Sequence, residues 1–102
     1  MAELKAHLEA DGFRIDGFTA LVPVQVWGWL PSGEPFYFRE RYGEVSFEVY
    51  DDGDLQELVG NRDATRWYAE VQSSEGIRAP SPSPAETEAL ILEFLGRYRE
   101  ER

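Results

Sequence analysis

The stretch Val22–Tyr50 constrains the fold of this chain more than any other segment. From Val22 onward the side chains alternate in character with a period of two, which is typical of a β-strand with one buried face. Two turn-like interruptions, at Leu30–Glu34 and at Tyr42-Gly43, divide the stretch into three strands. We therefore predict a three-stranded antiparallel meander, against which the rest of the chain must pack.

Both interruptions predict the same pairing register. The Leu30–Glu34 segment fits a three-residue hairpin loop in which Gly33 takes the left-handed bulge position. Tyr42-Gly43 fits a two-residue loop that pairs Arg41 with Glu44. Because a slip of one residue would turn every side chain over, these two loops fix the faces of the sheet. The apolar face is predicted to carry Val24, Val26, Phe36, Phe38, Val45, Phe47 and Val49.

Further elements flank the meander. A short helix is expected over residues 2–11, ending at Gly12, and Phe13–Thr19 is interpreted as an irregular connection, either a short strand or an apolar plug. Residues 65–72 alternate as a fourth strand. The segment Ser83–Glu86 has the pattern of a capping box with proline at the first helical position, and it predicts a helix that runs to about Arg99.

These elements predict a single α+β domain over residues 1–102. Its four-stranded, mainly antiparallel sheet is formed by the meander of residues 22–50 and the strand of residues 65–72. The short N-terminal helix and the longer C-terminal helix, residues 84–99, pack on it. Which face of the sheet the C-terminal helix covers does not follow from the sequence.

The charge of the chain limits its partners. The 102 residues carry a formal net charge of −10, which disfavours nucleic acids and anionic membranes because the electrostatic contribution would be repulsive. A basic partner protein is compatible with this charge, although solubility alone also explains it. The charged N-terminus lacks the apolar core of a secretory signal, so a cytoplasmic location is expected.

We expect no enzymatic activity, no bound metal and no cofactor. The chain has no cysteine, no glycine-rich phosphate-binding loop, and a single histidine, His7, with no nucleophile motif beside it. His7 is expected on the solvated surface. Asp51–Asp54 superficially resembles a calcium-binding loop, but the required ligand spacing is absent. A turn followed by a short helical segment, Asp54–Val59, is predicted there instead.

Two surfaces are candidates for binding. The first is the face of the sheet opposite the apolar one, because tryptophan, tyrosine and arginine are enriched at interface hot spots. Its candidate residues are Trp27, Trp29, Tyr37, Arg39, Arg41, Tyr50 and Tyr68. The second is an acidic rim, represented by Glu44, Glu48, Asp51, Asp52, Asp54 and Glu57. The alternatives are that the C-terminal helix buries the aromatic residues as core and that the rim is only solvated.

The hypothesis that follows is a small, acidic, non-catalytic protein-interaction module of the inhibitor, immunity or adaptor type. Small size, acidity and the lack of catalytic residues resemble, as a class only, bacterial immunity, antitoxin-like and phage-encoded inhibitor proteins. The partner would be a basic protein. The alternative is a domain that binds a small ligand, or forms a homodimer, through the aromatic face of its sheet.

Overall fold

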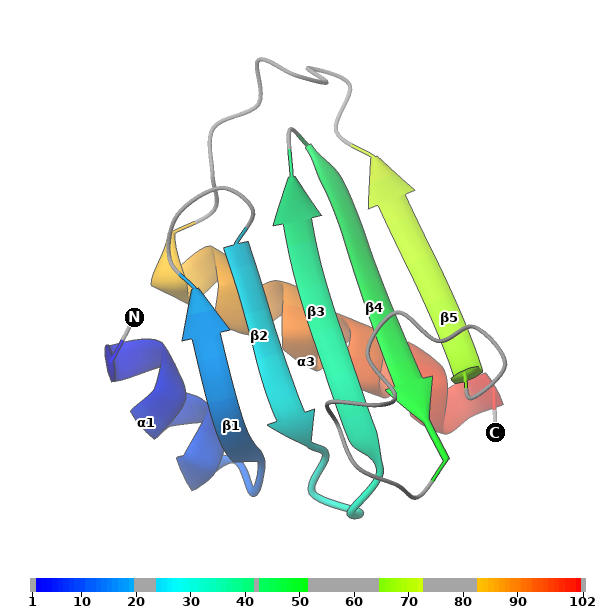
Figure 1. Cartoon of the computed structure of the whole chain (residues 1–102), viewed down its shortest axis with the longest axis horizontal. Coiled ribbons are helices and arrows are strands. Elements are labelled where there is room, and N and C mark those ends of the chain that lie inside the picture. The colour runs from blue at the N-terminus through cyan, green and yellow to red at the C-terminus, as the bar shows by residue number, and fades with distance from the viewer. Residues whose placement is uncertain (1, 20–23, 42, 52–64, 73–82, 102) are drawn as a thin grey trace.

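The computed structural model describes residues 2–19, 24–41, 43–51, 65–72 and 83–101, in which a five-stranded antiparallel sheet is backed by two helices (Figure 1). The strands follow one another in chain order across the sheet. The elements are α1 (Ala2–Ala10), β1 (Arg14–Thr19), β2 (Val24–Trp29), β3 (Pro35–Arg41), β4 (Glu44–Tyr50), β5 (Thr65–Gln72) and α3 (Pro84–Glu101).

The predicted register of the meander is confirmed. Val26 pairs with Phe38, and Phe38 pairs with Phe47, so these residues share one face. The first hairpin closes through a hydrogen bond from the Leu30 N–H to the Glu34 carbonyl at 2.8 Å, and Gly33 has φ of +102°. That left-handed conformation is accessible to glycine without the steric cost of a Cβ atom. The residues of the turn therefore determine which side chains of the meander share a face of the sheet.

Over the described residues the sheet has five strands, and the prediction of four was wrong because it left out β1. Arg14–Thr19 pairs with β2, and the register shifts between Ile15 and Gly17. Asp16 is the extra residue of this β-bulge, so Ile15 and Phe18 lie on the same side of the sheet although they are three residues apart. The bulge hides the period of two on which the sequence prediction depended.

Both helices pack on the apolar face of the sheet (Figure 1). Phe94 of α3 stacks on Phe47 of β4, with ring centroids 5.3 Å apart, and Leu8 of α1 belongs to the same buried cluster. The C-terminal helix therefore covers the valine and phenylalanine side. The opposite side of the sheet has no described helix on it, and we call it the aromatic face, after Trp27, Trp29, Tyr37 and Tyr68.

The helix ends follow the predicted capping chemistry. The Glu86 N–H donates to Ser83 Oγ at 3.1 Å, and the Ser83 N–H donates to a Glu86 carboxylate oxygen at 3.3 Å. This reciprocal pair is the expected capping box. At the other end of the chain, α1 stops before Gly12, which has φ of +100°.

Some predictions fall on residues outside the described ranges. They concern the short helical segment Asp54–Val59, the conformation of Tyr42 in the second loop, and Val22 at the start of the meander. Within the described ranges, neither helix is both long and apolar enough to cross a membrane.

Candidate functional site

A row of four side chains crosses the aromatic face from β2 to β5. Trp27 pairs with Tyr37, Tyr37 pairs with Glu48, and Glu48 pairs with Tyr68. Directly paired residues of an antiparallel sheet have neighbouring side chains, so the row places a carboxylate between two tyrosine rings. A parallel row beside it consists of Gln25, Arg39, Ser46 and Glu70.

Trp27 is held in one orientation on this face. Its indole Nε1–H donates to Asp16 Oδ2 at 3.0 Å. Its ring lies over Gly17 of β1, where an added Cβ atom would come within 2.5 Å of the indole. Gly17 therefore provides the space in which the ring lies, and the Asp16 bulge provides the acceptor. Trp27 is neither bare nor fully buried.

Two other aromatic residues of this face are also fixed by polar neighbours. The Arg14 guanidinium lies over the Trp29 ring, 4.7 Å from its centroid. The Tyr37 hydroxyl donates to Gln25 Oε1 at 2.7 Å, and the Gln25 side chain donates onward to Thr19. Such contacts reduce the conformational entropy that a side chain loses when a partner binds.

The environment of Tyr37 favours its neutral form. Burial raises the pKa of the Tyr37 hydroxyl above its ordinary value. The positive charge of Arg39 opposes this rise, and the carboxylate of Glu48 adds to it. Tyr37 is therefore a neutral hydrogen-bonding group at physiological pH.

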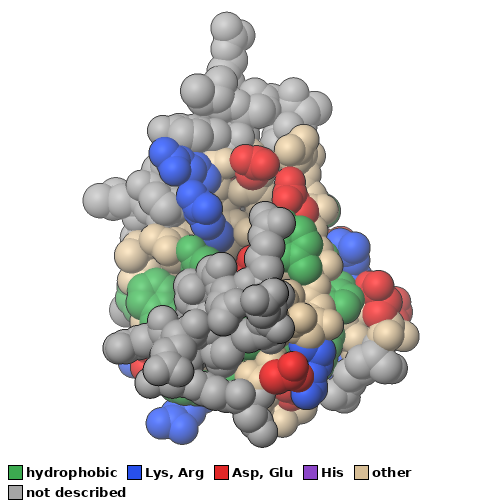
Figure 2. Space-filling view, turned by 45° about the vertical axis from the view of Figure 1, so that its right-hand side comes forward, with side chains coloured by type: hydrophobic (Ala, Val, Ile, Leu, Met, Phe, Trp, Pro, Cys, Tyr) green, Lys and Arg blue, Asp and Glu red, His purple; other side chains and the backbone are tan. Residues whose placement is uncertain are grey.

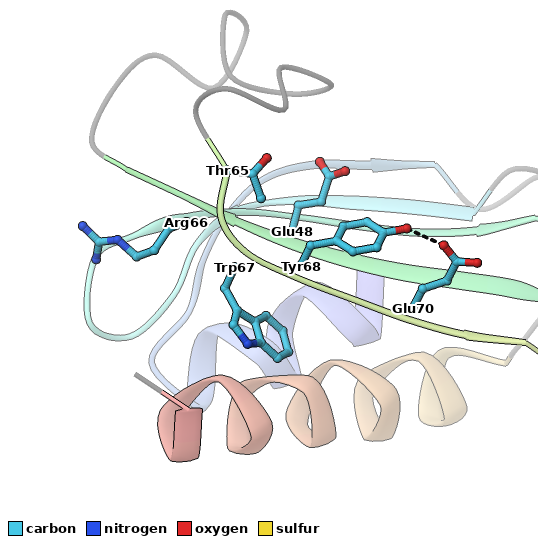
Figure 3. Close-up of a pocket in the computed structure, with 6 residues that line it drawn as sticks. All are labelled: Glu48, Thr65, Arg66, Trp67, Tyr68 and Glu70. Carbon is cyan, nitrogen blue, oxygen red and sulfur yellow. Dashed lines mark hydrogen bonds between the residues drawn. The ribbon is translucent and has the colours of Figure 1, made fainter.

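A cavity of about 560 Å³ adjoins the β5 end of the aromatic row (Figure 3). Tyr68 extends along it with its hydroxyl hydrogen-bonded to Glu70, whereas Trp67 points to the other side of the strand, toward α3. Tyr68 is 48% exposed, the largest exposed fraction among the large hydrophobic side chains described. The described residues that line the cavity are Glu48, Thr65, Arg66, Trp67, Tyr68 and Glu70.

A smaller hollow of about 130 Å³ continues the same surface and shares Tyr68 and Glu70 with the first. Arg39 and Arg41 contribute to it, together with Glu44 and Ser46. Acidic, basic and hydrophobic side chains are interspersed on this side of the molecule (Figure 2). The two hollows therefore differ in charge, because the larger one lacks both of these arginines.

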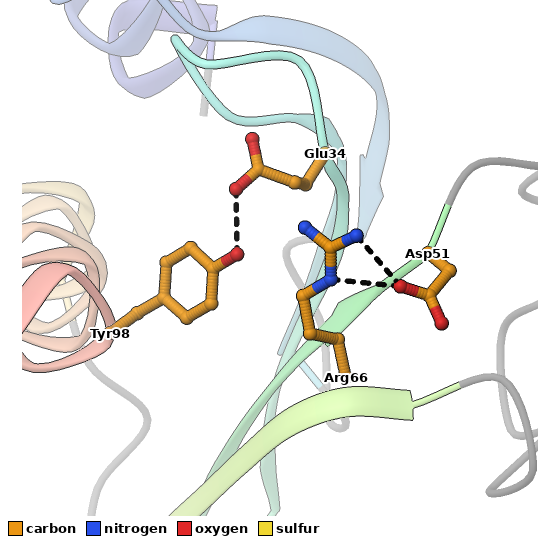
Figure 4. Close-up of polar contacts among 4 residues, drawn as sticks. All are labelled: Glu34, Asp51, Arg66 and Tyr98. Atoms are coloured by element: carbon orange, nitrogen blue, oxygen red, sulfur yellow. Dashed lines mark hydrogen bonds and ion pairs between the residues drawn. The ribbon is translucent and has the colours of Figure 1, made fainter. Parts of the chain in front are cut away.

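Arg66 is tied to its surroundings at the edge of the larger cavity (Figure 4). Its guanidinium pairs with the Asp51 carboxylate at 2.8 Å. A hydrogen bond with the Tyr98 side chain, followed in importance by the Asp51 interaction, raises the pKa of Arg66 above its ordinary value. Arg66 is thus held toward Asp51, while Glu48 and Glu70 lie along the cavity.

The structure does not bring all the predicted residues of the aromatic face together in one place. Trp27, Tyr37, Arg39 and Tyr68 lie together in the two rows, Trp29 stands beside Arg14, and Arg41 lines the smaller hollow. Tyr50 is fully buried, which removes it from any binding surface. Its burial coincides with a register shift between Val49 and Tyr50 that no sequence pattern indicates.

The acidic rim is described only in part. Glu48 lines the larger cavity, Glu44 lines the smaller one, and Asp51 pairs with Arg66. Asp52, Asp54 and Glu57 lie outside the described residues.

Sequence reasoning missed Glu70 and Arg66 as site residues. The alternation along Thr65–Gln72 carried the signal for Glu70, because it puts Glu70 on the same side of the strand as Tyr68. No sequence pattern indicates the place of Arg66, because the register with β4 skips this residue.

Two other observations bear on chemistry. His7 on α1 has an exposed side chain and lies 3.6 Å from a carboxylate oxygen of Glu88. Among the residues that the structure describes, no group of three or more histidine, aspartate or glutamate side chains is arranged to hold a metal ion.

No family model, curated protein or solved structure matches this chain.

Proposed function

We propose that this chain is a non-catalytic interaction module that binds a basic segment of a partner protein on the β5 half of its aromatic face. The observation that carries the proposal is the cavity of about 560 Å³, where the exposed Tyr68 ring lies between Glu48 and Glu70. A carboxylate beside an aromatic ring suits a lysine or arginine side chain. The ring contributes about 0.5–1 kcal/mol through a cation–π contact at an exposed site.

The net charge supports the same partner over longer distances. A chain with a net charge of −10 attracts a basic protein and accelerates the encounter, and added salt weakens this attraction. Asp52, Asp54 and Glu57 contribute to this charge wherever they lie. The described part of the aromatic face carries both positive and negative side chains. Specificity therefore comes from the cavity, whereas the encounter rate comes from the net charge of the whole chain.

The rigidity of the aromatic row supports a role in recognition. Trp27 and Tyr37 are each fixed by a side-chain hydrogen bond, to Asp16 and to Gln25. Aromatic side chains that are ordered before binding lose little entropy in the complex, and they are typical of interface hot spots. The row extends the contact surface from the cavity toward β1.

The test uses a synthetic arginine- and lysine-rich peptide as the probe, with an acidic peptide of equal length as its counterpart. We expect the basic peptide alone to bind, and Tyr68→Ala and Glu48→Gln to weaken its binding severalfold. Glu100→Gln is the matched control, because it removes one negative charge from the exposed surface of α3. If Glu48→Gln and Glu100→Gln weakened peptide binding equally, the net charge alone would account for the loss. That result would overturn the cavity as the binding site.

A second candidate function is the binding of a small ligand in the same cavity. Its volume lies in the range of roughly 300–1,000 Å³ that is typical of small-molecule sites. The two functions differ in salt dependence, because a neutral ligand would bind Tyr68 without sensitivity to ionic strength. A screen of small aromatic and cationic compounds by tryptophan fluorescence, at low and high salt, distinguishes them.

A further inference from the structure

The strand β5 forms one edge of the described sheet (Figure 1). Its register with β4 skips Arg66, so the strand has a bulge near its start. From Trp67 to Gln72 every residue pairs with β4 in regular order. At the other edge, β1 is shorter, carries its bulge in the middle, and has α1 packed beside it. The segment of β5 beyond its bulge is therefore the more regular of the two edges.

The register of the sheet shows which backbone groups of this segment point away from β4. The Leu30 N–H bonds to the Glu34 carbonyl, and bonded and non-bonded pairs alternate along an antiparallel ladder. Following this alternation through β3 and β4 directs the backbone groups of Val71 to β4, and those of Glu70 and Gln72 to the outer edge. The described part of the chain offers these outward groups no strand to pair with. Each of the two residues thus presents a donor and an acceptor at the edge.

Two large hydrophobic side chains flank this edge, one on each face of the sheet. Tyr68 is 48% exposed on the aromatic face, and Val71 is 40% exposed on the helix side. In the described part of the chain, three large hydrophobic side chains are exposed, and the third is Leu92 on α3. A strand added beside β5 would cover both of the side chains that β5 exposes.

From this edge we propose that the basic segment of the partner binds as an added strand, antiparallel to β5 and hydrogen-bonded to Glu70 and Gln72. Sheet edges bind extended peptides in this way, with main-chain hydrogen bonds providing affinity and alternate side chains providing specificity. The inference rests on the proposed function, because it takes the same partner and the same cavity and adds how the segment is held.

The two faces of the sheet require an alternating sequence in the added strand. On the aromatic face its side chains stand beside the Tyr68 ring and the Glu70 carboxylate, which favour arginine or lysine. The intervening side chains point to the helix side, where Val71 favours an apolar residue. The segment that fits therefore has basic residues two positions apart, with an apolar residue between them.

The charge of the chain favours a basic segment over a second copy of the chain. Between Trp67 and Gln72 the one charged residue is Glu70, and the whole chain has a net charge of −10. Two copies would repel each other, whereas a basic strand is attracted and gains an opposite-charge pair across the ladder.

Two peptides of the same composition test the alternation. In one peptide arginine and valine alternate, and in the other the arginines and the valines form two separate blocks. We expect the alternating peptide to bind about tenfold more tightly, because it alone places every arginine on one face. Equal affinities would overturn strand addition and leave the proposed function standing. If neither peptide bound, both proposals would fall.

Methylation of the peptide backbone tests the hydrogen bonds. In the antiparallel pairing the arginines donate their N–H groups to β5, whereas the N–H groups of the valines point away. N-methylation of the arginines should therefore weaken binding by about tenfold or more, and N-methylation of the valines should change it by less than about twofold. Equal losses, or a greater loss on methylating the valines, would contradict the proposed pairing.

Two variants at Gln72 test the protein side of the same bonds. Gln72→Pro removes the outward N–H, and Gln72→Ala is the matched control that keeps it. Both variants lose the side chain that donates to Glu44 at 3.4 Å. Proline is tolerated where the N–H of an edge strand faces outward, and circular dichroism checks that both variants are folded. We expect Gln72→Pro to bind the alternating peptide severalfold more weakly than Gln72→Ala, and equal binding would count against the added strand.

Hydrogen exchange locates the added strand directly. Saturation with the alternating peptide should slow exchange of the Glu70 and Gln72 amides. The Ala69 and Val71 amides, which point to β4, should be protected with or without the peptide. A bound peptide that leaves the Glu70 and Gln72 amides unchanged would show that the segment occupies the cavity through its side chains alone, contrary to the proposal.

Discussion

The Tyr98 hydroxyl on α3 donates a hydrogen bond to Glu34 Oε2, at 2.6 Å, in the hairpin between β2 and β3 (Figure 4). The two residues are 64 positions apart in the sequence. Tyr98 is 1% exposed and packs against Trp67, with ring centroids 5.7 Å apart. One side chain therefore connects the C-terminal helix to the first hairpin and to the last strand.

Tyr98→Phe keeps the ring and removes the hydroxyl, so it isolates the polar part of this connection. We expect the free energy of unfolding to fall by about 2 kcal/mol, because hydrogen bonds to charged groups contribute more than neutral ones. Urea denaturation measures the change. Glu34→Gln and the double variant complete a double-mutant cycle, and strictly additive effects of the two changes would contradict a direct coupling.

Substitution of two glycines by alanine compares a position where a neighbouring backbone lies close with a position that has open space. A Cβ atom at Gly28 would lie 2.1 Å from the Arg14 carbonyl oxygen of the neighbouring strand, whereas one at Gly96 on α3 meets no atom within 4 Å. Gly28→Ala should therefore destabilise the protein by about 3 kcal/mol or more. Gly96→Ala should stabilise it by about 0.5–1 kcal/mol, because alanine favours the helix. Thermal unfolding compares the two variants, which should shift in opposite directions.

Gly17→Ala should displace the Trp27 ring while leaving the fold intact, because the clash at 2.5 Å is with a side chain and not with the backbone. The displaced indole loses its hydrogen bond to Asp16, which should move the Trp27 indole N–H resonance in a nitrogen–proton correlation spectrum. We expect a cost of about 1 kcal/mol in stability. Asp16→Asn serves as the control, since an amide oxygen remains an acceptor and the resonance should move less.

The raised pKa of Tyr37 predicts that the free energy of unfolding falls at alkaline pH. Its folded-state pKa lies above the unfolded value of about 10, so the contribution is fully present below about pH 10 and is lost as pH rises through the folded-state pKa. The unfolded chain releases this proton first. Tyr37→Phe should therefore show a shallower decline in unfolding free energy as the pH rises above about 10. Parallel declines in the two proteins would contradict the assigned shift.

Much of the sheet could be predicted from the sequence because its turns have local signatures. Gly33 and the Tyr42-Gly43 pair each define a loop length, and two loop lengths are enough to assign a face to every residue between Val24 and Tyr50. The row that joins Trp27, Tyr37 and Glu48 follows from those loops alone. The Ser83 cap of α3 was predictable for the same reason, since its partner Glu86 is three residues away.

The features that escaped prediction depend on contacts between distant segments. The sequence of β1 predicts an irregular connection because the Asp16 bulge breaks its alternation, and only pairing with β2 reveals the strand. Glu40 is a buried carboxylate, 3% exposed on the helix side, where one of its oxygens accepts from the Gly43 N–H at 3.1 Å. The choice of sheet face by α3 is likewise decided by the stacking of Phe94 on Phe47.

The one-sided packing of the sheet divides the residues of each strand into two sets with separate roles. Phe38 and Phe47 maintain the fold, whereas Tyr37 and Glu48, one position away, face outward and can change with little effect on the core. Variation can therefore accumulate on alternate residues of β2 to β5 while the architecture persists. A chain built in this way can acquire a new partner by substitutions along two cross-strand rows, and the same rows are suitable positions for a combinatorial library.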